Sequence, residues 1–322
     1  MKFPKGSNLE GSAQPADSKA GRSDPKGITD LIGTSIIKTI KYSDHFGFPL
    51  TASEIHLRLI SSEPCSLERV FGTLQLMLKS KMIQQTQDYY HLPGKKSLVA
   101  RRSNHLKSSN PQLLRAITLS KKISHAPFIK AIYLTGSLAM NNSKNDSDID
   151  FMIITAEGKL WTTRFILTIL TTLLGLRRTP HSINNSGKLC LNLYLTPDSY
   201  LLPTHKQSIY TAYELIQAVP VYDPSDTRDV LLAANPWIKK YLSNVITGSD
   251  LDGCAQPAYS KAGRSDPKGL IRRPGQTLSD TIEYLLFHLQ YFYMRPKLTR
   301  EYITINSAFF HPLDPSPPVL KV

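Results

Sequence analysis

A short stretch of the chain combines residue types that suit phosphate and metal chemistry. An apolar run at 129–135 ends at Gly136-Ser137, and the chain then reaches Asp148 and Asp150. A glycine between a strand and a helix lets the backbone approach a ligand closely, and the unpaired N–H groups of the helix start attract anions. Because side chains alternate along a strand, Asp148 and Asp150 point to the same side. Two like charges so placed favour a cation between them, and their oxygens suit Mg²⁺.

The motif GSLAMNNSKNDSDIDFMII, residues 136–154, resembles the GS…SDxD signature of the polymerase-β-like nucleotidyltransferase superfamily. Members bind a nucleoside triphosphate (NTP), transfer the nucleoside monophosphate to a hydroxyl or similar acceptor, and release pyrophosphate. The resemblance implies that Gly136 and Ser137 hold the β- and γ-phosphates. It also implies that Asp148 and Asp150 are the catalytic, metal-binding residues, with Mg²⁺ as cofactor and Mn²⁺ as an alternative ion.

The family adds a third carboxylate on a later strand, which helps bind the catalytic ion and activate the acceptor. That strand is expected at 188–195, where Cys190, Asn192 and Tyr194 alternate with leucines. The third position then falls at Asn192, whose amide ligates metals weakly and cannot act as a carboxylate base. The implied metal ligands are the two aspartates and Asn192. The absence of a third carboxylate puts catalytic turnover in question more than nucleotide binding.

Two arginines follow the helix expected at 160–174. Arg177 and Arg178 have the donor geometry to contact a triphosphate or nucleic acid, and they would equally suit a solvated helix C-terminus. Both are retained as candidate nucleotide-binding residues.

Composition narrows the class of protein. The 39 Lys and Arg against 25 Asp and Glu give a net charge of +14, which favours a polyanionic partner. The 3 cysteines form no CxxC pair, which excludes a disulfide framework and a structural zinc site. The N-terminus lacks a secretory apolar segment, and the longest apolar-leaning run, 165–176, is too short for a membrane span. A cytoplasmic protein without membrane contact is predicted.

Three small helices and a hairpin are expected over 29–98, a pattern that resembles a winged helix-turn-helix. A Thr51–Glu54 capping box and a Ser66 cap open its second and third helices. The third helix, which would be the DNA-recognition helix, has few basic side chains. DNA binding and a structural or protein-binding role therefore both stay open. Residues 89–145 hold ten basic residues and no acidic one. Nucleic acid is therefore a candidate partner through this stretch or through the winged helix.

The predicted fold class is α+β: the winged helix, a nucleotidyltransferase domain over 106–200 with a mixed sheet and flanking helices, and a helical C-terminal region over 201–250 and 271–322. Asn110 is expected to cap a helix ending near 124. Helices are expected at 279–294, with an apolar side for the core, and at 301–310.

Two nearly identical segments interrupt this plan. AQPADSKAGRSDPKG lies in the tail at 1–28, and AQPAYSKAGRSDPKG lies in 251–270. Both are poor in apolar side chains, so they are predicted to be disordered. Their near-identity has two explanations: a sequence element that was inserted twice, or a linear motif that the protein uses twice.

Three functions stay open. The first is an Mg²⁺-dependent nucleotidyltransferase acting on RNA, protein or a small molecule. The second is a catalytically degenerate, nucleotide-binding regulator whose winged helix contacts DNA or a protein partner. The third is an antitoxin-like nucleotidyltransferase that modifies a toxin.

Overall fold

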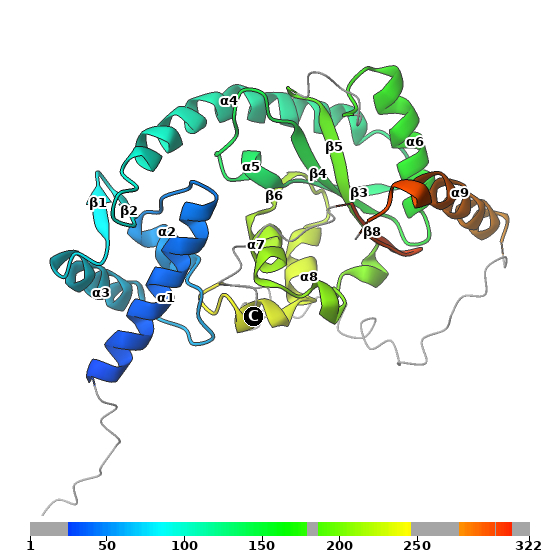
Figure 1. Ribbon diagram of the computed structural model, residues 1–322. Helices are drawn as coiled ribbons and strands as arrows, with labels where there is room; N and C mark the ends of the chain where they lie inside the picture. Colours follow the sequence, from blue (N-terminus) through cyan, green and yellow to red (C-terminus); the bar gives the residue numbers. More distant parts are fainter. Residues whose placement is uncertain (1–24, 179–185, 246–276, 300, 311–322) are drawn as a thin grey trace, which may run out of the picture.

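The computed structural model describes residues 25–178, 186–245, 277–299 and 301–310. A small N-terminal unit lies beside a larger unit built on one mixed sheet, and the long helix α4 (Ser97–Ile123) arches from one to the other (Figure 1). This is the predicted α+β class, with a mixed sheet and flanking helices. The two copies of the repeated segment, 13–27 and 255–269, lie outside the described residues apart from 25–27.

The N-terminal unit has the predicted elements in the predicted order: α1 (Pro25–His45), α2 (Ala52–Leu57), α3 (Leu67–Lys79), β1 (Gln84–Thr86) and β2 (Tyr89–His91). The expected capping box is confirmed, since Thr51 and Glu54 each accept a hydrogen bond from the other's backbone N–H. Ser66 caps α3 by accepting a hydrogen bond from the Arg69 N–H on its side-chain oxygen. The apolar sides of these elements form a core of their own. Their assignment to the winged-helix class stays a prediction.

Six strands form the main sheet in the order β6-β3-β4-β5-β8-β7. Their bounds are β3 (Ile129–Leu134), β4 (Ile149–Thr155), β5 (Leu189–Leu195), β6 (Val219–Tyr222), β7 (Tyr302–Ile303) and β8 (Ser307–Phe309). Only the pairing of β4 with β5 is parallel among these described strands.

Helices cover both faces of this sheet. One face packs against α4, α6 (Leu160–Leu173) and α9 (Leu278–Met294). The other packs against α7 (Ile209–Gln217), α8 (Thr227–Ala233) and the 3-10 turn Pro236–Lys240. The four-residue α5 (Gly136–Ala139) follows β3, and further 3-10 turns occupy Pro197–Ser199, Thr204–Lys206 and Arg295–Lys297.

The predicted alternation of side chains is confirmed in β4 and is wrong for part of β5. The pairing of β5 skips from Leu191 to Leu193 while β4 advances by one residue. The extra residue is Asn192, and a β-bulge of this kind reverses the sides of all residues beyond it. Tyr194 therefore packs among the residues beneath α4 and α6, on the side of the sheet away from Cys190.

The prediction that Asn110 begins a helix is also wrong, because α4 starts at Ser97 and runs through Pro111. Contacts with other elements hold the helix on both sides of the proline, and after it Ala116, Leu119 and Ile123 pack into the core beneath the main sheet. Before it, Arg102 binds the N-terminal unit, and Ser109 accepts a hydrogen bond from the Ser143 N–H at 3.0 Å. A proline costs a helix one hydrogen bond, which these contacts offset.

The C-terminal region is less helical than predicted. Residues 301–310 form the short hairpin β7–β8, and β8 pairs with β5. β6 likewise joins the sheet beside β3. Short apolar segments can enter either a helix or a strand, and pairing with a distant strand decides between them here.

Helix α9 has the inverse orientation to the one predicted. Its polar Glu283 and Gln290 are buried, whereas Leu285, Leu289 and Phe292 are exposed by 60% or more. The Glu283 carboxylate accepts hydrogen bonds from the backbone N–H groups of Trp161 (2.6 Å) and Thr162 (2.9 Å) at the start of α6. The free energy gained by giving these α6 N–H groups an acceptor exceeds the free energy that would be gained by burying the apolar side of α9. None of the described helices, α9 included, has the length and apolar character needed to cross a membrane.

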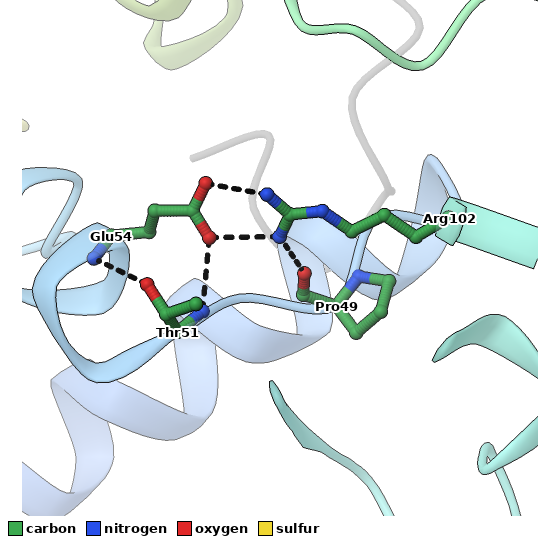
Figure 2. Close-up of polar contacts among 4 residues, drawn as sticks. All are labelled: Pro49, Thr51, Glu54 and Arg102. Carbon is green, nitrogen blue, oxygen red and sulfur yellow. Dashed lines mark hydrogen bonds and ion pairs between the residues drawn. The ribbon is translucent and has the colours of Figure 1, made fainter. Parts of the chain in front are cut away.

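A bidentate ion pair fixes α4 to the N-terminal unit (Figure 2). The Arg102 guanidinium donates to both carboxylate oxygens of Glu54, at 2.7 and 2.8 Å, and also to the carbonyl oxygen of Pro49. It lies over the rings of Phe48 and Tyr89, with its central carbon 4.0 and 4.5 Å from their centroids. Burial disfavours the charged carboxylate. The hydrogen bonds from Arg102 and Thr51, together with the positive charges of Arg102 and Arg58, outweigh this effect and hold the pKa of Glu54 below its usual value.

Replacing Glu283, the buried side chain that caps the start of α6, should destabilise the fold. We expect Glu283→Ala to lower the free energy of unfolding by about 2–4 kcal/mol, because it removes a charged acceptor and leaves two backbone N–H groups buried. Chemical denaturation measures this. The exposed Glu157 near the same helix provides the control, since Glu157→Ala should change stability by less than about 0.5 kcal/mol. Equal losses in the two variants would contradict the capping role.

The Glu54 ion pair predicts a pH dependence. A carboxylate with a lowered folded-state pKa stabilises the protein above its unfolded-state pKa, and this contribution is lost as the pH falls through the folded-state pKa. We expect Glu54→Gln to cost about 1–3 kcal/mol at neutral pH and progressively less as the solution is acidified. Urea unfolding across that range tests this, with the exposed Glu63→Gln as control. A loss that stays constant with pH would contradict it.

Candidate active site

The turn after β3 lies directly against β4. Because the two strands are antiparallel, the end of β3 meets the start of β4, and the Thr135 N–H donates to the Asp150 carbonyl oxygen at 2.9 Å. Gly136 follows with φ of +66°, a conformation that favours glycine. A Cβ atom on Gly136 would lie 2.5 Å from an Asp150 carboxylate oxygen. An added Cβ would therefore force the Asp150 side chain to move, and both Gly136 and Ser137 are exposed.

The two aspartates occupy the predicted positions, on the same side of the sheet. Asp148 precedes β4 and Asp150 is its second residue. Burial, together with the negative charge of Asp148, raises the pKa of Asp150 to about 7. Hydrogen bonds from Cys190 and Asn192 and the positive charge of Arg178 oppose this rise. A cation would stabilise the charged form of both carboxylates.

Cys190 is the β5 residue paired with Asp150. Its sulfur and one carboxylate oxygen from each of Asp148 and Asp150 all lie within 4.8 Å of one another. Burial and the negative charges of the two aspartates raise the pKa of the Cys190 thiol. Two carboxylates and a thiol at this spacing can surround one metal ion, so the donor set fits a divalent cation.

Asn192, expected as the third metal ligand, lies in the same cluster. It is buried at the β5 bulge, and its amide Nδ2 donates to Asp150 Oδ1 at 2.8 Å. In this arrangement the amide orients the Asp150 carboxylate. Asn192 lies on the same side of β5 as Cys190, as regular alternation predicts, and the bulge reverses the sides only of the residues beyond it.

The structure brings one of the two candidate arginines into the cluster. The Arg178 guanidinium forms an ion pair with the Asp148 carboxylate. Arg177 lies in an extended segment bridged to Leu189, and its charge acts on Arg164 and Tyr194 instead. Consecutive residues of an extended segment point to opposite sides, which separates the two arginines.

Sequence reasoning selected Asn192 and passed over Cys190. A signal for Cys190 was present: period-two alternation places residues 190 and 192 on one side of the strand, two residues apart. Which of the two meets Asp150 depends on the register between β4 and β5, and a single strand carries no information on that register.

The close approach of Gly136 to Asp150 can be tested by substitution. Gly158→Ala is the matched control, since Gly158 has a similar φ of +62° with no atom within 4 Å of an added Cβ. We expect Gly158→Ala to cost about 1–2 kcal/mol of unfolding free energy from backbone strain alone. Gly136→Ala should cost at least about 1 kcal/mol more, because Asp150 must also move. Chemical denaturation of both variants measures the difference, and equal costs would contradict the contact.

Comparison with known proteins agrees with this geometry. The family model described as "Polymerase beta, Nucleotidyltransferase" matches residues 118–183, a range that includes Gly136, Ser137 and both aspartates and ends before β5. No curated protein and no solved structure matches the chain. This match supports the resemblance of residues 118–183 to the polymerase-β-like nucleotidyltransferase superfamily.

Proposed function

We propose that the protein is an enzyme that transfers a nucleoside monophosphate from an NTP to an acceptor in a metal-dependent reaction. The acceptor oxygen forms a bond to the α-phosphorus, the bond from that phosphorus to the bridging oxygen breaks, and pyrophosphate leaves. The acceptor proton passes to solvent. The acceptor is an RNA end, a protein hydroxyl or a small molecule.

Support comes above all from the approach of the Gly136-Ser137 turn to Asp150. It places an exposed turn, suited to phosphates, beside two carboxylates suited to a divalent ion. In this proposal Gly136 and Ser137 hold the β- and γ-phosphates, and Asp148 and Asp150 hold Mg²⁺, or Mn²⁺ in its place. The ion would neutralise charge on the phosphates and orient the α-phosphorus.

Arg178 supplies positive charge at the same place. Its ion pair with Asp148 keeps a guanidinium beside the carboxylates, where it can meet a phosphate oxygen. Arg177, the other sequence candidate, would have to turn to the opposite side of its segment to make such a contact.

The basic stretch favours nucleic acid as the first acceptor to test. Its ten basic residues are exposed with the exception of Arg102, which is committed to Glu54. Several of them, including Lys107, Lys121 and Lys122, lie on α4 beside the sheet. Exposed lysines without nearby acids in sequence attract phosphate groups.

Label transfer tests the activity. The full chain is incubated with each α-labelled NTP, Mg²⁺ or Mn²⁺, and a mixed pool of RNA and protein acceptors. We expect the wild-type protein to transfer label. We expect Asp148→Asn or Asp150→Asn to reduce transfer by more than about a hundredfold, because that exceeds the loss seen when a residue only supports a metal ligand. Asp146→Asn is the control, because Asp146 is an exposed carboxylate in the same loop. Equal transfer by all three variants would contradict the assignment.

A second function, the nucleotide-binding regulator, is favoured by one observation. The amide of Asn192 lies beside Asp150, at the position where a third carboxylate was expected. If wild-type protein binds NTP without transferring label, and Asn192→Asp creates transfer, the regulator is the better assignment. Transfer by wild-type protein excludes it.

A further inference from the structure

The third donor at the candidate metal site is a sulfur atom, which the carboxylate chemistry of the proposed function does not require. Cys190 pairs with Asp150 across the parallel β4–β5 ladder, so the two side chains leave the sheet on the same side. The sulfur lies within 4.8 Å of a carboxylate oxygen of both Asp148 and Asp150. A metal ion between the two aspartates would therefore have the sulfur within reach.

We propose that Cys190 is the third protein ligand of this site and that it shifts the metal preference from Mg²⁺ toward divalent ions that accept a thiolate, such as Zn²⁺ and Co²⁺. This inference rests on the proposed function only in that Asp148 and Asp150 bind a cation.

The chemistry of the donors gives the direction of this shift. Mg²⁺ takes oxygen ligands in near-ideal octahedral geometry and keeps several waters. Thiolate sulfur is a soft ligand that suits zinc and other transition ions, and zinc accepts cysteine sulfur together with aspartate oxygen. Replacing one oxygen donor by sulfur weakens a site for Mg²⁺ and strengthens it for Zn²⁺.

Asn192 acts beside this ligand set as a positioning residue. Its amide donates to Asp150 Oδ1, so it fixes the carboxylate from the side while Cys190 lies across the ladder from it. A hydrogen bond of this kind orients a ligand without adding a donor to the metal.

Co²⁺ titration of the full-length protein, stripped of metal with a chelator, tests the sulfur ligand directly. A cobalt–thiolate bond gives a strong near-ultraviolet absorption band that oxygen ligands do not give. We expect this band in the wild-type protein and its loss in Cys190→Ser. Cys65→Ser and Cys254→Ser remove the other two cysteines and should keep the band. Thermal unfolding of each variant verifies that it is folded.

Competition between metals tests the preference. Because Zn²⁺ binds most sites more tightly than Mg²⁺, the informative quantity is the change in the Zn²⁺-to-Mg²⁺ affinity ratio between variants. We expect Cys190→Asp to lower that ratio by at least about tenfold. Losing a residue that only supports a metal ligand already lowers metal affinity by about tenfold or more, and losing a ligand should do at least as much. Equilibrium dialysis against both metals measures it.

The outcomes separate this inference from the proposed function. A cobalt site without the sulfur band, or a band that survives Cys190→Ser, overturns the role of Cys190 and leaves the two aspartates as ligands. Cobalt binding that Asp148→Asn and Asp150→Asn do not weaken overturns both. A band that is lost in Cys190→Ser but kept in the other two cysteine variants, with a lowered ratio in Cys190→Asp, supports the inference.

Discussion

The approach of the Gly136 backbone to the Asp150 carboxylate is the constraint on which the rest of the site depends. It follows from the antiparallel pairing of β3 with β4, which puts the end of one strand at the start of the other. A turn suited to phosphates and a carboxylate pair thus meet at one edge of the sheet. A residue larger than glycine would force the Asp150 side chain to move, because its Cβ would lie 2.5 Å from a carboxylate oxygen.

This proximity has an electrostatic cost that the protein offsets locally. Burial and the charge of Asp148 raise the pKa of Asp150 to about 7, so the site disfavours two ionised carboxylates without a cation. The Arg178 ion pair and the amide of Asn192 reduce that cost. A site held in this state gains most from a bound metal ion, since the ion removes the repulsion that neighbouring side chains only partly offset.

Local patterns predicted the parts of the fold that local interactions determine. The Thr51–Glu54 capping box, the Ser66 cap and the alternation along β4 follow from short-range spacing, and all three are confirmed. The Gly136 turn and the two aspartates belong to the same class, because one short segment contains them.

The errors concern contacts between distant segments. The bulge at Asn192 depends on how β5 aligns with β4, and that alignment decides whether residue 190 or 192 lies across the ladder from Asp150. The orientation of α9 depends on the need of α6 for an acceptor, which Glu283 supplies across more than a hundred residues of sequence. The sequence of β5 alone does not reveal its alignment with β4, and the sequence of α9 alone does not reveal that α6 requires an acceptor.

The N-terminal unit is part of the body of the protein, because several contacts besides the Arg102 pair join it to the larger unit. The Tyr42 and Tyr213 rings stack at 4.4 Å, and the Tyr213 hydroxyl donates to the Arg58 carbonyl oxygen at 2.6 Å. Asn244 accepts from the Cys65 N–H at 2.8 Å.

Such a unit can present α3 to a partner only in a fixed orientation relative to the sheet. The exposed residues of α3 include Leu67, Phe71 and Leu76, together with one acidic side chain, Glu68, and two basic ones, Arg69 and Lys79. A surface that is mainly apolar and has only two basic residues gives phosphates little to bind, whereas the exposed lysines of α4 lie on the element that leads to the sheet. Under the proposed function, the charge distribution favours α4 over α3 as the surface that a polyanionic acceptor would meet.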